Sequence, residues 1–117
     1  MSAGALDIVA EQGATFALAL LWTDTTDVPI DLTGYAARMH VRNVPNASTF
    51  VIELTTENGR IALGATAGTI NLLIDAETTA ALPAGEFVYD IELVQAGDGV
   101  TRLLEGAFSI RAEVTRP

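Results

Sequence analysis

The sequence contains no cysteine and no lysine, and His40 is its single histidine. Without cysteine there are no disulfide bridges, no thiolate nucleophile and no cysteine-ligated zinc site. Its 6 basic residues, all arginine, stand against 15 acidic ones, so the formal net charge is −9. This acidic balance opposes binding to duplex nucleic acid, because contact with a phosphate backbone needs clustered cations.

Long hydrophobic runs are also missing. The longest, residues 16–22, is far shorter than the roughly 20 residues that span a bilayer, so we expect no membrane span. Residues 1–6 lack the basic and apolar parts of a secretory signal, and we expect synthesis in a cytoplasm. Apolar residues are nevertheless abundant, at 50% of 117, which is enough for one domain over residues 1–117. We expect residues 1–6 to form a flexible or partner-bound N-terminal arm.

Alternation of apolar and polar residues is the dominant pattern, and it is typical of half-buried strands. Alternation and short apolar runs predict strands at residues 7–10, 15–22, 35–42, 49–55, 60–63, 69–74, 87–94, 100–104 and 108–114. In segment 35–42, for example, Arg38, His40 and Arg42 share the polar face. Among the aromatic residues, Phe50 and Phe87 fall on predicted core faces.

Turn residues separate these segments, and Gly97-Asp98-Gly99 is the clearest hairpin signal. Only residues 75–82 predict a short helical turn, with Asp75 as the N-cap and Pro83 after its end. Many short strands without long helical spacers favour an all-β, antiparallel sandwich with Greek-key connections, with a closed barrel as the alternative. Segment 82–89 also resembles the turn into strand F of immunoglobulin-like domains, with Phe87 where the corner tyrosine is expected.

His40 is the first candidate for chemistry, because general base catalysis needs an imidazole near a nucleophile and an orienting carboxylate. The alternation places it with Arg38 and Arg42, so we interpret it as a solvated strand histidine. We therefore expect that the protein is not an enzyme, with no catalytic residue and no cofactor.

Strand carboxylates are the second candidate, because paired carboxylates can serve acid and base roles. They are Glu53, Asp90 and Glu92. We instead expect cross-strand ion pairs between these groups and Arg38, Arg42 or Arg111.

The segment that follows the strand at 15–22 is the candidate interface. Trp22 is either core or a binding anchor, and its phase with Phe16 favours the core. Asp24, Asp27 and Asp31 share one loop, which suggests a hard-cation site, but their spacing does not fit an EF-hand. We favour local hydrogen bonds to the loop backbone and expect no metal.

A series of short motifs follows one another along the chain. The series comprises Asp31-Leu32-Thr33-Gly34-Tyr35, Met39 with Val41-Arg42, Gly68-Thr69-Ile70, Leu82-Pro83-Ala84-Gly85 with Tyr89-Asp90, Arg102-Leu103-Leu104-Glu105-Gly106, and Glu113-Val114-Thr115-Arg116. In order and spacing it resembles small β-sandwich structural proteins of tailed bacteriophages. It is also similar to the N-terminal domain of phage upper baseplate proteins, over about residues 7–116. That family brings no catalytic residues with it.

The resemblance implies a non-enzymatic virion structural protein of the tail, baseplate, neck or fibre-attachment region. It would act through contacts with other virion proteins, as a homo-oligomer or ring, and would bind no nucleic acid, membrane or small-molecule substrate. Its expected location is the virion, after synthesis in the host bacterial cytoplasm. The alternatives are a carbohydrate- or host-surface-binding β-sandwich module, with or without calcium, and a capsid decoration protein.

Overall fold

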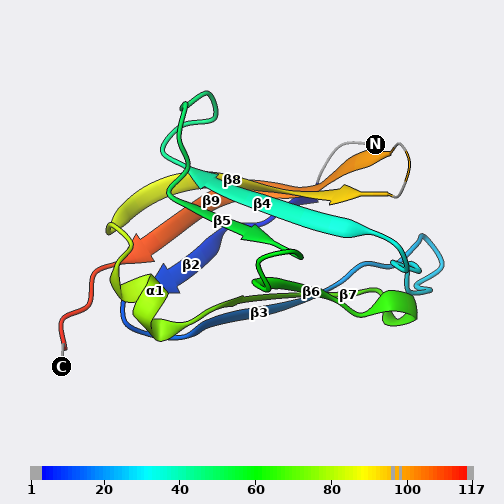
Figure 1. The fold of residues 1–117 in the computed structure, drawn as a ribbon, viewed down its shortest axis with the longest axis horizontal. Helices are drawn as coiled ribbons and strands as arrows, with labels where there is room; N and C mark the ends of the chain where they lie inside the picture. Colours follow the sequence, from blue (N-terminus) through cyan, green and yellow to red (C-terminus); the bar gives the residue numbers. More distant parts are fainter. Residues whose placement is uncertain (1–3, 96, 98, 116–117) are drawn as a thin grey trace.

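The chain folds as a sandwich of two β-sheets in the computed structural model (Figure 1). The structure describes residues 4–95, 97 and 99–115. The elements are β1 (Gly4–Ala5), β2 (Ile8–Glu11), β3 (Phe16–Leu21), β4 (Ala36–Arg42), β5 (Ile52–Thr55), β6 (Ile61–Leu63), the 3₁₀ turn η1 (Ala65–Ala67), β7 (Thr69–Ile74), α1 (Ala76–Ala80), β8 (Gly85–Val94) and β9 (Val100–Arg111). The prediction of an all-β sandwich is confirmed.

The order of the strands is that of an immunoglobulin-like sandwich. The larger sheet runs β1-β9-β8-β4-β5, with β2 also paired to β9, and the smaller sheet runs β3-β7-β6. Figure 1 shows the smaller sheet beneath the larger one. In immunoglobulin domains one sheet holds strands A, B, E and D, and the other holds C, F and G. Here β3, β7 and β6 take the places of B, E and D, and no described strand occupies the place of A beside β3.

The sandwich is not purely antiparallel, which corrects the prediction. Strands β1 and β2 both run parallel to β9, with Ile8 opposite Phe108. Parallel neighbours need a long connection, and here almost the whole chain lies between the paired strands.

The expected N-terminal arm covers residues 1–6. Of these, Gly4 and Ala5 pair with β9 and Leu6 N–H donates to Glu105 O at 3.1 Å, whereas residues 1–3 lie outside the described part of the chain.

One strand, β9, replaces the two that were predicted at 100–104 and 108–114. The apparent break falls at Gly106, where an added Cβ would lie 2.3 Å from the Leu6 carbonyl oxygen. Glycine therefore lets the N-terminal segment approach the strand closely. The predicted hairpin joins β8 to β9, with Gln95 N–H donating to Gly99 O at 2.7 Å, although Asp98 itself lies outside the described residues.

Two further differences concern the chain between strands. The predicted helix over 75–82 is confirmed in shorter form as α1, and the Asp75 carboxylate caps it by accepting from Thr78 N–H at 2.8 Å. Phe50 is not in the core, because β5 begins only at Ile52, and the ring is 48% exposed. The alternation of apolar and polar residues includes Phe50 in the sequence, but strand β5 does not extend back to it.

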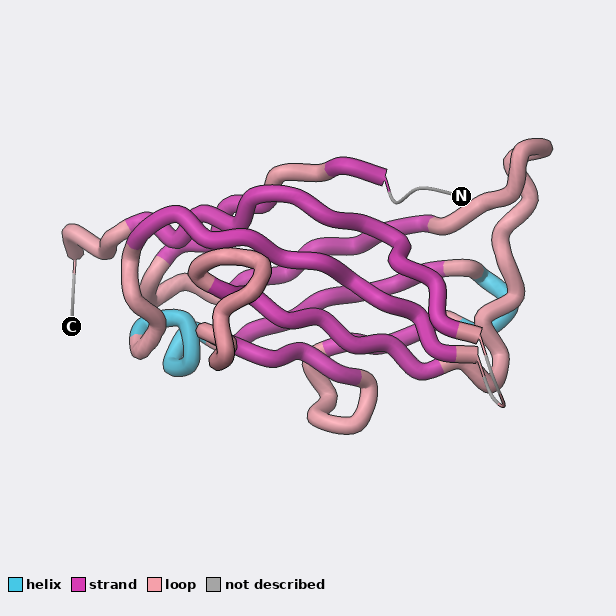
Figure 2. Tube along the Cα trace, turned by 90° about the horizontal axis from the view of Figure 1, so that it is seen from above, coloured by secondary structure: helices cyan, strands magenta, loops and turns pink. Residues whose placement is uncertain are grey.

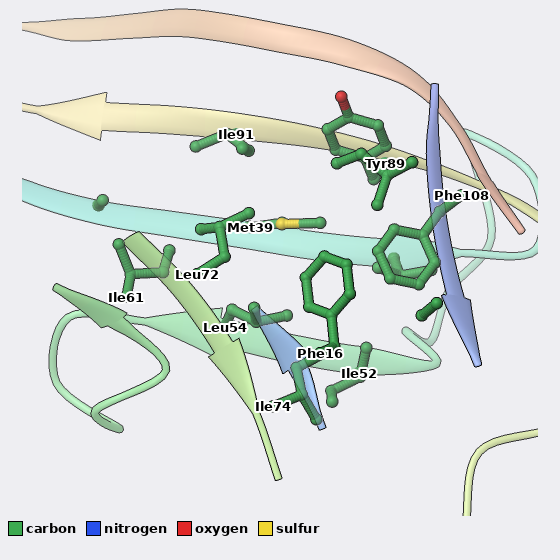
Figure 3. Packing of buried hydrophobic residues seen from close by; sticks show 14 of the residues in the cluster. Phe16, Met39, Ile52, Leu54, Ile61, Leu72, Ile74, Tyr89, Ile91 and Phe108 are labelled. Atoms are coloured by element: carbon green, nitrogen blue, oxygen red, sulfur yellow. The ribbon is translucent and has the colours of Figure 1, made fainter. Parts of the chain in front are cut away.

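The core lies between the facing sides of the two sheets, and Figure 3 shows its packing. Phe108 of β9 is fully buried between two aromatic rings, with centroids 5.9 Å from Phe16 and 6.2 Å from Tyr89. Met39 of β4 and Leu72 of β7, both almost fully buried, pack in the same cluster. The alternation in the sequence predicted the inward positions of four of these residues, whereas no face was predicted for Leu72.

Tyr89 carries a hydroxyl on the strand-F equivalent, but it does not make the bond to backbone a few residues upstream that a corner tyrosine makes and that Phe87 cannot make. It lies two residues later on β8, and its hydroxyl donates to the Leu6 carbonyl oxygen at 2.5 Å. Burial and the nearby Asp7 carboxylate raise the pKa of Tyr89 to about 12. The bond fastens the N-terminal segment to the larger sheet.

We expect Tyr89→Phe to lower the free energy of unfolding by about 1 to 2 kcal/mol, because a buried hydrogen bond is lost while the ring stays in place. The amide of Leu6 should also exchange faster with solvent. Urea unfolding and hydrogen exchange measure the two effects. Tyr35→Phe is the control, since the described residues give no hydrogen bond to its hydroxyl. Equal losses in the two variants would contradict the role of the Tyr89 hydroxyl.

Candidate functional site

Trp22, the first predicted interface residue, lies just past the end of β3. It is partly buried and packs against the core, as its phase predicted. Its N–H donates to Gly68 O and its carbonyl oxygen accepts from Ile30 N–H, each at 2.9 Å. The same residue lines an apolar groove at the edge of the sandwich, so its position combines a core contact with a surface one.

Asp24 organises the loop that follows Trp22. Its carboxylate oxygen accepts from Thr26 N–H at 2.8 Å, from the Thr26 hydroxyl at 2.7 Å and from Val28 N–H at 3.1 Å. These hydrogen bonds, the Thr26 hydroxyl first, lower the pKa of Asp24 below its ordinary value. The predicted local hydrogen bonding is confirmed for this residue.

The Asp24 loop should respond to acid. Because the pKa of Asp24 is lower in the folded chain than the ordinary 3.8, its contribution to stability is present above that value and is lost as the pH falls through the folded pKa. We expect the amide resonances of Thr26 and Val28 to shift together in that acid range. An NMR titration of the wild type and of Asp24→Asn measures this, because asparagine keeps the acceptor and does not titrate. Identical titrations in the two proteins would contradict the assignment.

The other two aspartates of the loop do not join Asp24 in a metal site. Asp31 accepts from Thr33 N–H at 2.9 Å, and its hydrogen bonds to Thr33 lower its pKa. Asp27 occupies a left-handed backbone position, with φ of 63°. Among residues 4–95, 97 and 99–115, no group of three acidic, histidine or cysteine side chains is placed to hold a metal ion. Within the same residues, no helix is long and apolar enough to cross a membrane.

His40 has more partners than the predicted solvated histidine. It lies on the outer face of the larger sheet, where its Nε2 is 2.9 Å from Glu53 Oε2 and its Nδ1 is 3.1 Å from an Arg42 guanidinium nitrogen. The Phe50 ring stacks on it, with centroids 4.9 Å apart and an interplanar angle of 24°. A guanidinium group only donates hydrogen bonds, so Nδ1 accepts, and Nε2 carries the proton that is donated to Glu53.

This arrangement leaves neither ring nitrogen of His40 free to take a proton from a substrate. A general base acts through an unprotonated nitrogen, which here is Nδ1, and this atom accepts from Arg42. Sequence reasoning missed Glu53 as the partner because the two residues are 13 positions apart. Only the pairing of β4 with β5, which places them directly opposite each other, brings them together.

Several other charges on this face form exposed ion pairs. Arg38 pairs with Glu92 at 2.8 Å, as predicted. Asp90 pairs at 3.4 Å with Arg102, which the sequence reading did not propose, and Arg102 also lies 3.7 Å from Glu105. Each exposed pair contributes about 0 to 1 kcal/mol. The outer face of the larger sheet is thus charged, and much of its charge is balanced internally.

Figure 2 shows the strands from above, running along the length of the sandwich. A groove lies along the side of the sandwich that is formed by β1, β2 and β3. Its apolar part measures about 420 Å³ and is lined by Gly4, Ala5, Leu6, Leu20, Leu21, Trp22, Ile70, Thr101, Arg102, Leu103 and Leu104. A second part of about 320 Å³ lies between residues 6–11 and 14–18. Both parts follow the outer edge of β3.

Strand β3 presents unpaired backbone groups to that groove. Trp22 N–H donates to Gly68 O, and the register of β3 with β7 continues unchanged, so the even-numbered residues of β3 hydrogen-bond to β7. The N–H and C=O groups of Ala17, Ala19 and Leu21 therefore point to the other side. No described residue pairs with that side of β3.

The outer face of the smaller sheet is uncharged. Strands β3, β6 and β7 contain no charged residue. Leu21 and Leu73 are 61% and 50% exposed on this face. Its remaining outward side chains are small or neutral: Ala17, Ala19, Ala62, Thr69 and Asn71. In a chain with a net charge of −9, the smaller sheet therefore presents an uncharged face and edge.

Comparisons with known proteins identify no family and no relative: no protein-family model matches the sequence, and no curated protein is significantly similar to it.

Proposed function

We propose that the chain is a non-enzymatic structural protein of a tailed-bacteriophage virion, and that it joins parts of the tail, baseplate, neck or fibre-attachment region through protein–protein contacts. The phage assignment rests on the order and spacing of the motifs between residues 31 and 116. The observation that carries the contact function is the unpaired edge of β3 beside an uncharged sheet face. Modules of this kind bind through strand edges and flat faces.

The candidate chemical groups support contact rather than catalysis. Both ring nitrogens of His40 are engaged, and the strand carboxylates Glu53, Asp90 and Glu92 each have a partner. The Asp24 and Asp31 carboxylates are used to hold their own loop. Because an immunoglobulin-like sandwich hosts many functions, these sites carry more weight than the fold itself.

The partners proposed are other virion proteins, with further copies of this chain among them. The acidic net charge disfavours nucleic acid, and the uncharged face suits a partner surface that is itself weakly charged. Small subunits of this kind act most often in closed symmetric assemblies.

Quantitative mass spectrometry of purified particles from the source lysate tests the proposal. We expect the chain in intact virions at a fixed copy number that is a multiple of the tail or baseplate symmetry. Antibody labelling viewed by electron microscopy should place it on the tail or neck. Absence from the particles would overturn the proposal. Labelling of the whole capsid surface would overturn the tail assignment in favour of capsid decoration.

A further inference from the structure

The outer edge of β3 differs from the other strand edges of this chain. Proteins blunt exposed edges by keeping them short, charging them, or adding proline or a bulge. Strands β5 and β6 are only four and three residues long, and β2 ends in Glu11. Strand β3 has six residues, and it contains no charge, no proline and no register shift with β7.

We infer that the edge of β3 pairs with the same edge of a second copy of this chain, in an antiparallel, two-fold symmetric arrangement. This inference names one partner for the contact surface on which the proposed function rests. Two three-stranded sheets then join across the pair into one continuous sheet, β6-β7-β3 followed by β3-β7-β6 of the second copy. The interface is isologous, so each copy offers the same residues to the other.

The backbone of β3 is self-complementary in one register. If Ala19 lies opposite Ala19 of the second copy, Ala17 lies opposite Leu21, and Leu21 opposite Ala17. These are the three residues whose N–H and C=O groups point away from β7. In an antiparallel pair, residues that exchange both hydrogen bonds lie directly opposite each other. Each copy therefore donates three backbone hydrogen bonds and accepts three.

The side chains fit the same register. Alanine opposite alanine at the two-fold axis brings no steric conflict, and each Leu21 lies beside the small Ala17 of the other copy. Cross-strand pairs of this kind add to the stability of the ladder. The apolar outer face, with Leu21 and Leu73, becomes continuous across the two copies.

Charge favours a second copy at this place over any other. Two molecules with a net charge of −9 repel each other, and the repulsion is largest where acidic groups face one another. Strands β3, β6 and β7 carry no charge, whereas the outer face of the larger sheet carries charges of both signs, with Glu92 paired to Arg38 and Asp90 paired to Arg102. A strongly charged partner gains no ion pair at the neutral edge of β3, and a second copy of this chain meets no like charge there, so the neutral edge suits an identical chain.

Sedimentation equilibrium over a wide range of protein concentrations tests this inference on the full chain. We expect the apparent mass to rise from that of one chain to that of two. Over the same range, hydrogen exchange at the amides of Ala17, Ala19 and Leu21 should slow. A single-chain mass at all concentrations would overturn the inference, and so would a dimer without slower exchange in β3.

Two variants and one control locate the contact. Ala19→Lys places two like charges directly opposite each other and should weaken the association about tenfold or more. Asn71→Lys adds the same charge to the same face on the central strand β7 and should leave edge pairing almost unchanged. Loss of the dimer in Asn71→Lys but not in Ala19→Lys would show face-to-face stacking and overturn the inference.

Ala19→Pro guards against a folding defect in the lysine variant. Proline removes the Ala19 N–H, which points away from β7, so every hydrogen bond within the smaller sheet is kept. We expect a folded monomer, and a folded dimer would contradict the pairing. The two proposals fail separately: a chain that is present in virions but monomeric overturns only the pairing, and a dimer that is absent from virions overturns only the phage function.

Discussion

Replacement of Phe108 by alanine is expected to lower the free energy of unfolding by about 3 to 5 kcal/mol. The side chain is fully buried, and it lies between the rings of Phe16 and Tyr89 at 5.9 and 6.2 Å. Its removal leaves a cavity between the two sheets, where Figure 3 shows the side chains of Phe108, Phe16 and Tyr89 close together. A loss of that size is a large part of the roughly 5 to 15 kcal/mol that stabilises a typical domain.

Denaturant unfolding measures this effect, because the midpoint and slope together give the free energy of unfolding. Phe50→Ala is the matched control, because it makes the same truncation at a phenylalanine whose side chain is 48% exposed. We expect that control to cost less than about 1 kcal/mol, as for most surface changes. A similar loss in the two variants would show that Phe108 is not the central core residue.

Gly68→Ala is expected to have the second largest effect, about 2 to 4 kcal/mol. Gly68 has a φ of 68°, which strains any residue with a Cβ. An added Cβ would also lie 2.8 Å from the Trp22 carbonyl oxygen and 3.1 Å from the Ile30 nitrogen. Both are backbone atoms of the segment that follows β3, so the Trp22 loop would have to move.

Gly59→Ala separates backbone strain from crowding. Gly59 has a similar φ of 80°, but nothing lies within 4 Å of an added Cβ. We expect this control to cost about 1 to 2 kcal/mol, from the left-handed conformation alone. Thermal unfolding of both variants gives the comparison. If Gly59→Ala were as harmful as Gly68→Ala, the contact with the Trp22 loop would not be the cause.

Local patterning predicted the strands well. Each of the predicted segments overlaps a strand, with the last two both on β9, and Phe16, Met39 and Phe108 are buried as their phase required. The cap at Asp75 and the hairpin between β8 and β9 were also predicted, because both depend on a few adjacent residues.

The errors arose where the outcome depends on distant neighbours. A two-residue period is the same for parallel and antiparallel strands, so it could not reveal that β2 runs parallel to β9. The predicted segments 100–104 and 108–114 left Gly106 unassigned between them, whereas it lies within β9 at the place where Leu6 approaches the strand. The partner of His40 was missed for the same reason, because Glu53 reaches it only through the pairing of β4 with β5.

The candidate site shows the same division. Trp22 and Asp24 could be selected from the sequence, and local hydrogen bonding was predicted for the loop as a whole, whereas the partners of Asp24, Thr26 and Val28, came from the structure. The phage resemblance likewise depends on the sequence alone. The unpaired edge of β3 had no such signal, since its six residues resemble those of any half-buried strand.

The sequence by itself therefore determined which residues face inward, where the turns lie and how little charge β3 carries, because these properties depend on the residues and their immediate neighbours. Only the tertiary structure decided which strands stand side by side, and with them the parallel N-terminal strands, the His40 pair and the open edge of β3. The physical reason is that strand pairing joins segments that are far apart in the chain. Whether a strand lies inside a sheet or at its edge is a property of that pairing and not of the strand's own residues.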